Sequence, residues 1–412
     1  MNVLMFFPYA PLPPPLDLGG TKRNLPFLIE NLKRHQVSVL AYGSKEEEEI
    51  FKGAFGGSCK HVVFVSRKRP RVLNAIQYLW LLMTGRSPFQ MVYRDKMQKV
   101  LDRMLQREDF DIVHCCTPML GYFRFPREIP VISDTHEVTY DLKYRTFQKA
   151  NNIFYKLLLY LEFLLARRDE IKLCQRFEAV ISTTERDYEV FRKNLDEHKL
   201  FVISNGVHTS FLEPSKVKTE PKTMVFTGLM SYYPNNHGIL YFLKNIFPLI
   251  LNQVPEAKIL IVGKNPSKEL LRYASERVVI TGYVEDVRPY MARAEVFIIP
   301  LLIGGGIRGK ALEAMAMKIP IVTTSIGCES IHLKHEDSAL FADQPAEFAD
   351  AVLRLFKDES LGKKLTKRAY QTVLEQYNWT EKGNDLHRVY EFALDNHRFE
   401  RMSKDRSKIY VA

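Results

Sequence analysis

The sequence has few cysteines, and none of them is spaced as a zinc-binding or redox pair. Its 412 residues contain five cysteines, an odd number, with no C-x-x-C spacing. Cys115 and Cys116 are adjacent within an apolar run, which indicates buried thiols in a reducing compartment. The scarcity of cysteine therefore argues against a disulfide-stabilised secreted domain and against a structural zinc site.

Long apolar runs are also absent. No stretch approaches about 18 uninterrupted apolar residues, the length that a membrane-spanning helix requires. The nearest candidate, residues 153–165, is interrupted by Lys156 and Glu162. Residues 1–8 lack a basic segment before an apolar core and have the pattern of a strand, so we expect no secretory signal peptide. These absences predict a cytoplasmic protein.

The composition that remains is that of a soluble globular protein, with 46% hydrophobic and 26% charged residues. A chain of 412 residues is too long for one ordinary core, so two domains of about 200 residues each are expected. The net charge is 59 − 48 = +11. This excess favours nucleotides, nucleic acids or acidic lipid headgroups as partners, without choosing among them.

Short apolar runs rich in β-branched residues alternate with helical segments along both halves of the chain. Runs that are apolar on both faces are typical of parallel sheets covered by helices, so we predict an α/β protein with two Rossmann-like, doubly wound domains facing a cleft. We expect an N-terminal domain over 1–207, a second domain over 208–383, and a C-terminal helix over 384–412 that can cross back to the first domain and ends in a basic tail. The predicted strands span 3–7, 37–42, 61–65, 111–115, 130–134, 179–183, 200–204, 224–228, 258–263, 278–281, 295–300 and 319–324.

The most informative segment is a glycine loop between a buried strand and a helix. The run from Gly304 to Lys310 reads GGGIRGK, and the glycines allow close approach of the backbone. The unpaired N–H groups and the dipole of a helix start favour an anion. Arg308 can hold a phosphate with two hydrogen bonds and Lys310 can add a point charge. The segment therefore predicts a phosphate site, with Gly304, Gly305 and Gly306 as backbone contacts.

The same residues begin like the P-loop of nucleotide hydrolases, but the match is incomplete. The spacing G-x4-G-K is present, whereas Ala311 occupies the position of the hydroxyl residue that holds magnesium. Glu313 lies three residues after Lys310 and shares its helix face. Such a carboxylate can accept two hydroxyl groups from a ribose; the alternative is a surface glutamate paired with Lys310.

These residues carry a resemblance to a known family. The segment from Gly304 to Val322 (GGGIRGKALEAMAMKIPIV) is similar to the donor-site segment of retaining family-4 glycosyltransferases with the GT-B fold. The likeness extends over nearly the whole chain, in segments that occur in the family's order: residues 14–41, 203–207, 225–236, and 280–294.

The resemblance implies a sugar transfer from a nucleotide-diphospho-sugar of the UDP or GDP type, with retention of anomeric configuration. The sequence has no cluster of Asp and His with metal-ligand character, so we expect no metal or other cofactor. It assigns Glu313 to the ribose and His136, after the strand 130–134, to the donor sugar. The alternative for His136 is a structural hydrogen bond within its loop. The other implied substrate contacts are Gly19, Gly20, Gly228, Tyr283 and Val284. Catalysis would come from Arg308 and Lys310, which stabilise the departing diphosphate, together with His136.

The sequence departs from the family's pattern at two positions. Gly305 stands where a first glutamate usually contacts the donor sugar. Lys318 stands where a glycine usually ends the helix, so we expect a lysine in the left-handed conformation, at a cost of about 1 kcal/mol. In the first loop, Lys22 and Arg23 are either anion contacts or a solvated first helical turn.

Two apolar helical segments of the first domain have basic flanks. Residues 67–71 (RKRPR) precede the segment 72–83, and Arg167 and Arg168 follow the segment 153–165. This pattern suits an anionic membrane surface at the inner face of the cell membrane and a lipid-linked or glycan acceptor of the cell envelope. The alternative is that both helices are core with solvated ends.

Two other functional classes compete with sugar transfer. A nucleotide-sugar epimerase could use the same fold, but it would need a carboxylate acid/base pair, and Gly305 removes one candidate. A nucleic-acid-binding protein is suggested only by the charge of +11. The scattered Lys and Arg residues, without an aromatic–basic motif, predict no nucleic-acid partner.

Overall fold

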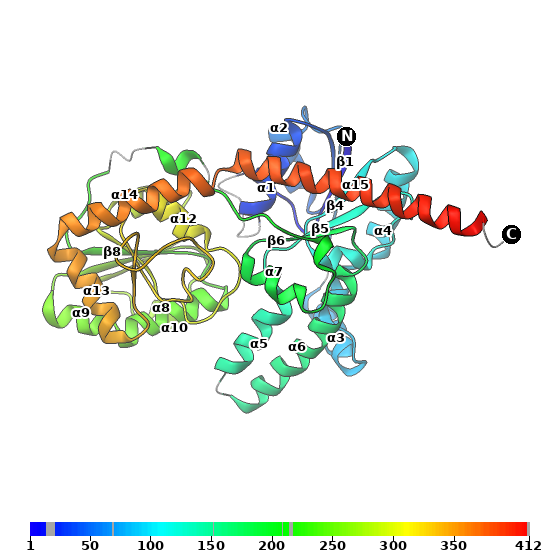
Figure 1. Cartoon of the computed structure of the whole chain (residues 1–412). Helices are drawn as coiled ribbons and strands as arrows, with labels where there is room; N and C mark the ends of the chain where they lie inside the picture. Colours follow the sequence, from blue (N-terminus) through cyan, green and yellow to red (C-terminus); the bar gives the residue numbers. More distant parts are fainter. Residues whose placement is uncertain (14–20, 68–69, 151, 208, 214–216, 410–412) are drawn as a thin grey trace. The chain divides into compact units, whose positions relative to one another are not determined.

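The computed structural model describes residues 1–13, 21–67, 70–150, 152–207, 209–213 and 217–409. The chain divides into two compact units (Figure 1). Unit 1 comprises Met1–Ser204 and Thr380–Ala412, and unit 2 comprises Asn205–Trp379. Each unit is an α/β structure around one parallel sheet, which confirms the predicted fold class.

The sheet of unit 1 has seven parallel strands in the order β3-β2-β1-β4-β5-β6-β7. Strand β1 pairs with both β2 and β4, so the chain order reverses between β1 and β4. In open sheets of this type, ligands bind beyond the carboxyl ends of the strands at such a reversal. The strands are β1 (Asn2–Phe7), β2 (Gln36–Tyr42), β3 (His61–Val65), β4 (Ile112–Cys115), β5 (Val131–Asp134), β6 (Ala179–Ser182) and β7 (Leu200–Val202).

Four strands of this sheet, β1, β4, β5 and β6, are buried along nearly their whole length, because helices cover both faces. The α-helices are α1 (Thr21–Leu32), α2 (Lys45–Phe55), α3 (Arg71–Met83), α4 (Asp95–Arg107), α5 (Thr139–Lys149), α6 (Ile153–Cys174), α7 (Glu185–Arg192) and α15 (Trp379–Ile409). Three short 3-10 helices complete the unit: η1 (Pro88–Val92), η2 (Pro118–Tyr122) and η3 (Glu197–Lys199).

The long C-terminal helix α15 packs across the sheet of unit 1. The Tyr390 hydroxyl lies 2.8 Å from Nδ1 of His114 in β4, and Phe392 packs against Phe201 in β7 with ring centroids 5.0 Å apart. Near its end, His397 lies 3.1 Å from Glu178. These contacts explain why residues from Thr380 onward belong to unit 1 although they follow unit 2 in the sequence.

Unit 2 repeats the architecture with six parallel strands in the order β10-β9-β8-β11-β12-β13. The chain order reverses between β8 and β11, which pair directly. The sequence missed β13, because two residues are too few to form a recognisable apolar run. The strands are β8 (Thr223–Thr227), β9 (Lys258–Val262), β10 (Val278–Gly282), β11 (Val296–Ile299), β12 (Ile321–Thr323) and β13 (Leu340–Phe341).

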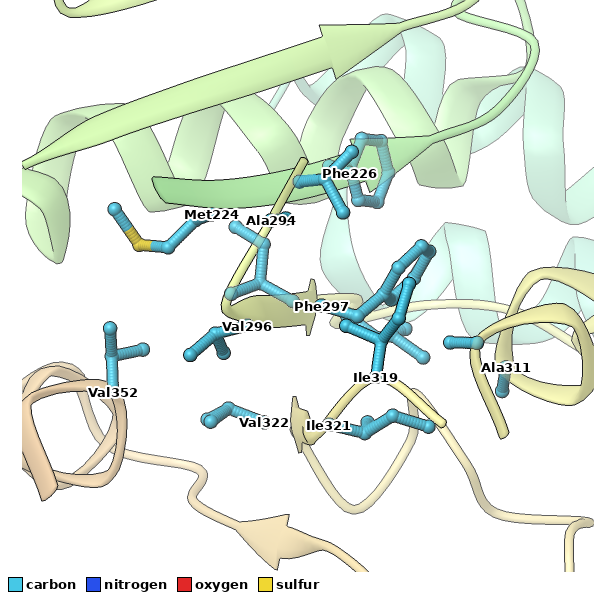
Figure 2. Packing of buried hydrophobic residues seen from close by; sticks show 14 of the residues in the cluster. Met224, Phe226, Ala294, Val296, Phe297, Ala311, Ile319, Ile321, Val322 and Val352 are labelled. Carbon is cyan, nitrogen blue, oxygen red and sulfur yellow. The ribbon is translucent and has the colours of Figure 1, made fainter. Parts of the chain in front are cut away.

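The core of unit 2 lies on both faces of its sheet. Figure 2 shows Val296 and Val322 directed toward Val352, whereas Ile321 and Ala311 lie on the opposite face. This division follows from the alternation of side chains along a strand. The helices are α8 (Tyr233–Asn245), α9 (Phe247–Gln253), α10 (Lys268–Leu271), α11 (Arg288–Ala292), α12 (Gly309–Ala316), α13 (Pro345–Lys357), α14 (Glu359–Gln376) and the 3-10 helix η4 (Thr209–Leu212).

Candidate functional site

The predicted phosphate site lies at the strand-order reversal of unit 2. Strand β11 is fully buried and is followed by the glycine loop, which leads directly into α12. The N-cap residue of α12, Arg308, makes no capping hydrogen bond through its side chain. Its first N–H groups have no intrahelical acceptor, so they are oriented to receive an anion. The structure therefore places the loop and the helix start at the point in the sheet where such ligands bind.

Arg308 immediately precedes α12 and folds back over the glycine loop. Its Nη1 donates to the carbonyl oxygens of Gly305 and, at 2.9 Å, Gly306, and its Nε is buried without a hydrogen-bond partner. A Cβ on Gly304 would lie 2.3 Å from Nη2 of Arg308, so a side chain there would displace the guanidinium. The guanidinium and the loop are thus packed together, with one donor still unsatisfied.

Lys310, in the first turn of α12, reaches the end of β8. Its Nζ donates to Oδ1 of Asn235 at 2.8 Å and lies 3.9 Å above the Phe226 ring. Nδ2 of Asn235 in turn donates to the carbonyl of Leu229 at 3.0 Å. The side chain is therefore fixed between an amide oxygen and an aromatic face. Neither Asn235 nor Phe226 was predicted; the available signal was a polar residue at the start of the helix after the unit's first strand.

Gly228 follows β8 and lies beside Lys310. A Cβ at this position would lie 2.9 Å from Nζ of Lys310 and 2.7 Å from Nδ2 of Asn235. Gly263, after β9, approaches still more closely, because its Cβ would lie 1.7 Å from the Gly228 carbonyl oxygen. The carboxyl ends of β8 and β9 therefore meet as bare backbone next to Lys310, which a side chain would prevent.

Tyr283 and Val284 follow β10 at the same edge of the sheet. The Tyr283 side chain is 50% exposed, and Nζ of Lys264 lies 5.5 Å from the centre of its ring. Val284 is half-buried against the core of unit 2. Tyr283 thus presents an exposed aromatic ring at this edge, whereas Val284 contributes an apolar surface.

Glu313 is buried on α12, with 6% of its surface exposed, so the alternative of a surface glutamate is wrong. The charges of Arg308 and Lys310 also act on a buried thiol, that of Cys328. Burial raises the pKa of Cys328 to about 11, and Arg308 and Lys310 act in the opposite direction. A buried carboxylate in the same helix as these cations is suited to a polar ligand rather than to solvent.

The helix ends as the sequence predicted at Lys318, which has φ of 56°. The Ile319 N–H donates to the Ala314 carbonyl at 3.0 Å and the Lys318 N–H to the Met315 carbonyl at 3.1 Å. These two bonds form a Schellman motif, whose left-handed residue is usually glycine.

In unit 1, His136 follows β5 near that sheet's strand-order reversal. The ring is half-buried; its Nε2 is buried without a hydrogen-bond partner. Burial lowers the pKa of His136 to about 4; Asp134 acts to raise this pKa and Arg23 to lower it. The imidazole is therefore neutral near pH 7. A hydrogen bond with the backbone of Cys116 also involves this residue.

Arg23 satisfies neither of the two alternatives that the sequence left for it. Its guanidinium is 1% exposed and binds Asp134 with Nε–Oδ2 and Nη2–Oδ1 distances of 2.8 and 2.6 Å. It is a buried ion-pair partner, rather than a free anion contact or a solvated residue. The predicted residues Gly19 and Gly20 lie outside the described residues, and so does the Lys22 side chain.

Among the residues that the structure describes, no group of three or more His, Cys, Asp or Glu side chains is arranged to hold a metal ion. The residues that the structure gathers in unit 2 are those of the predicted phosphate site. From the described parts of unit 1, it gathers His136 with the Arg23–Asp134 pair.

Two family models match adjoining parts of the chain. The model described as Glycosyltransferase Family 4 matches residues 18–211, and the one described as Glycosyl transferases group 1 matches residues 221–358. The chain belongs to the family 4 glycosyltransferases. Their GT-B fold accounts for the two parallel-sheet units.

Individual relatives of this glycosyltransferase are distant, and the share of the chain that they cover differs widely. An uncharacterized glycosyltransferase of Methanocaldococcus jannaschii is 24% identical over 93% of this chain and 96% of its own length. A putative teichuronic acid biosynthesis glycosyltransferase of Bacillus subtilis is 26% identical over 32% of this chain and 34% of its own length. The crystal structure of Anabaena HepE in complex with UDP is 13% identical, with a TM-score of 0.66 over 95% of this chain and all of that one.

Proposed function

We propose that this glycosyltransferase moves a sugar from a nucleotide-diphospho-sugar of the UDP or GDP type to a glycan or lipid-linked acceptor in cell-envelope polysaccharide synthesis, with retention of configuration. The observation that carries the proposal is that the glycine loop, Arg308 and Lys310 lie together at the start of α12, an arrangement that suits a phosphate. The HepE complex with UDP and the teichuronic acid relative support the donor and the pathway class.

The chemistry that these residues supply is stabilisation of the leaving group. As the bond between the anomeric carbon and the phosphate oxygen breaks, negative charge develops on the diphosphate. Lys310 is fixed by Asn235 and Phe226, so its charge is positioned before the substrate binds. Arg308 has a buried Nε donor to offer. We propose that these cations replace a metal ion, and that addition of EDTA leaves activity unchanged.

The remaining contacts divide between the nucleoside and the sugar. We propose that buried Glu313 accepts the ribose hydroxyls and that the exposed ring of Tyr283, with Val284, packs on the base. Gly228, whose own N–H bonds to the Val262 carbonyl, and the glycines 304–306 allow the backbone to approach the diphosphate and the sugar closely. From unit 1, the neutral ring of His136 has an unsatisfied Nε2, which suits a sugar hydroxyl. Gly19 and Gly20 stay as predicted contacts.

Binding of UDP, GDP and ADP, measured by calorimetry and by the ligand-dependent rise in melting temperature, tests the phosphate site directly. A charge-assisted hydrogen bond contributes about 1.5–3 kcal/mol, so Lys310→Met should weaken binding by about 10-fold to 150-fold. Arg308→Ala should abolish the melting shift. The matched control is Lys244→Met, which removes an exposed lysine from α8. If millimolar nucleotide shifts neither wild type nor control, the proposed donor site is wrong.

The reaction class needs a separate measurement. The protein is incubated with a bound nucleotide sugar and with candidate acceptors, and NMR of the product reports its anomeric configuration. Retention supports the proposal, whereas inversion contradicts it. Incubation with donor alone addresses the other enzyme class, because conversion of the donor to its epimer without an acceptor would favour an epimerase.

A further inference from the structure

The large apolar side chains that are exposed to solvent are concentrated in one part of unit 1. Of 25 such side chains among the described residues, 15 lie between residues 72 and 164. Phe154 and Met83 are each 80% exposed, and Val72 is 68% exposed. Soluble monomers seldom expose large contiguous apolar patches unless these bind something. The alternative that both helices are core is therefore wrong for α3 and for the first half of α6.

These side chains come from three helices that are tied together. The Tyr78 hydroxyl of α3 donates to Glu162 of α6, and Lys143 of α5 pairs with the same carboxylate. Helices α5 and α6 form an antiparallel hairpin, with α3 alongside α6 (Figure 1). The exposed apolar residues of this surface, here called the α3–α6 face, are Val72, Leu73, Ile76, Leu79, Trp80, Met83, Tyr144, Ile153, Phe154, Tyr155, Leu157, Leu158, Tyr160, Leu161 and Leu164.

The charges around the α3–α6 face are almost all positive. Residues 67–86 contain five basic residues and no acidic one, and the structure describes the side chains of two of these five, Arg67 and Arg86. Residues 139–172, which include α5 and most of α6, contain seven basic residues and four acidic ones.

All four of these carboxylates are neutralised or directed inward. Asp141 pairs with Arg186 at 2.7 Å, and Asp169 pairs with Arg168 at 2.8 Å. Glu162 is held by Lys143 and Tyr78. Glu170 is 2% exposed and accepts the N–H groups of Thr139 and Tyr140 at 3.2 and 3.0 Å. The face thus offers apolar side chains within a rim of cations.

Two cations of this rim lie against aromatic rings. The Arg86 guanidinium lies 5.3 Å from the centre of the Trp80 ring, and Nζ of Lys156 lies 5.2 Å from the centre of the Phe147 ring. Aromatic rings and cations at the edge of an apolar surface are suited to the boundary between acyl chains and headgroups. No helix of the described chain is long and apolar enough to cross a bilayer.

We propose that the α3–α6 face docks peripherally on an anionic lipid bilayer. The apolar side chains enter the interfacial region, and the basic rim contacts acidic headgroups. Among the described residues of this surface, the carboxylates of α5 and α6 are all paired or buried, which matches a negatively charged partner. Exposure around most of the first half of α6 suits a fluid layer better than a shaped protein groove. The proposal is independent of the donor chemistry, because binding is measured without nucleotide or acceptor.

The test uses the full chain and vesicles of phosphatidylcholine, with or without about 30% phosphatidylglycerol. Co-sedimentation at low salt should show binding at least about tenfold tighter to the anionic vesicles, weakening as salt screens the charges. Of the two tryptophans, Trp80 lies on the face and Trp379 does not. In the Trp379→Phe variant, Trp80 emission should therefore shift to the blue on binding.

Paired substitutions distinguish binding through the α3–α6 face from non-specific adsorption of exposed apolar side chains to the vesicles. Phe154→Ser with Leu157→Ser should lower vesicle binding by about tenfold or more, because the free energy gained when these two apolar side chains move from water into the bilayer is lost. The control, Leu374→Ser with Phe399→Ser, removes exposed apolar side chains of α14 and α15 and should bind like wild type.

Several results would overturn the proposal. These are equal binding to neutral and anionic vesicles, no binding to either, or equal loss of binding in the control. A dimer in sedimentation velocity that Phe154→Ser dissociates would instead assign the face to a second copy of the chain. Far-UV circular dichroism of each variant shows whether it is folded. The nucleotide-induced melting shift is measured on the same proteins, so that a failure of membrane binding is distinguished from a failure of the proposed function.

Discussion

Breaking the Arg23–Asp134 pair should strongly destabilise unit 1. Both side chains are 1% exposed, and the guanidinium makes contacts of 2.6 to 3.1 Å with both carboxylate oxygens. Arg23→Met keeps a long apolar side chain against Phe27, whose ring centre now lies 4.7 Å from the guanidinium carbon. It leaves Asp134 buried without its partner, which costs about 3–5 kcal/mol.

This cost is a large share of the stability of an ordinary domain, about 5–15 kcal/mol. With a urea m-value of about 3 kcal/mol/M, the unfolding midpoint should fall by about 1–1.7 M. Hydrogen exchange measured by mass spectrometry along the urea series reports unit 1 and unit 2 from separate peptides. Unit 2 should keep its wild-type midpoint.

Two further variants make the reasoning refutable. Arg23→Met combined with Asp134→Leu removes both charges and should recover most of the loss. Arg192→Met breaks a half-exposed pair with Glu189 in the same unit and should cost less than about 1 kcal/mol. If Arg23→Met is no more harmful than Arg192→Met, or if the double variant is as unstable as the single one, the buried-charge argument is wrong.

Three further predictions concern other sites. Lys318→Gly removes the backbone strain of a left-handed lysine but also loses a cation–π contact with Tyr370 at 4.2 Å. Because the relief of strain should exceed the lost contact, the melting temperature of unit 2 should rise by about 1–4 °C in calorimetry, and a fall would contradict this reasoning. Burial lowers the pKa of His114 to about 4, against 6.5 in the unfolded chain. Between these values the unfolded chain binds a proton that the folded state does not, so the free energy of unfolding is highest above pH 6.5 and decreases as the pH falls toward 4, by about 2 kcal/mol at pH 5. His114→Gln should flatten this part of the pH profile of urea unfolding, and an unchanged slope would refute the assignment. Glu313→Gln should weaken binding of UDP on the order of tenfold in calorimetry while leaving pyrophosphate binding unchanged; equal losses would exclude the ribose contact.

The predictions that succeeded depend on residues close together in the sequence. Alternating buried runs and helical segments indicated the parallel α/β fold, because a strand covered on both faces is apolar throughout. The connection from a buried strand through the glycine loop to a helix was predicted correctly because its residues are contiguous. That Arg308 and Lys310 bind a phosphate there stays a prediction. The strained Lys318 was also predictable, since a helix end is a local event.

The predictions that failed depend on what lies across the fold. Arg23 could not be assigned because its partner, Asp134, is 111 residues away. The first half of α6 is apolar on nearly every side, so its sequence has no polar stripe to distinguish a core helix from an exposed one.

The sequence by itself thus determined the two parallel-sheet units and the glycine loop between a buried strand and a helix, because backbone geometry and side-chain alternation are local. Only the tertiary structure decided that Asn235 and Phe226 fix Lys310, that Arg23 is buried, and that the α3–α6 face is exposed. The physical reason is that burial and pairing depend on which neighbours the rest of the chain brings to a residue.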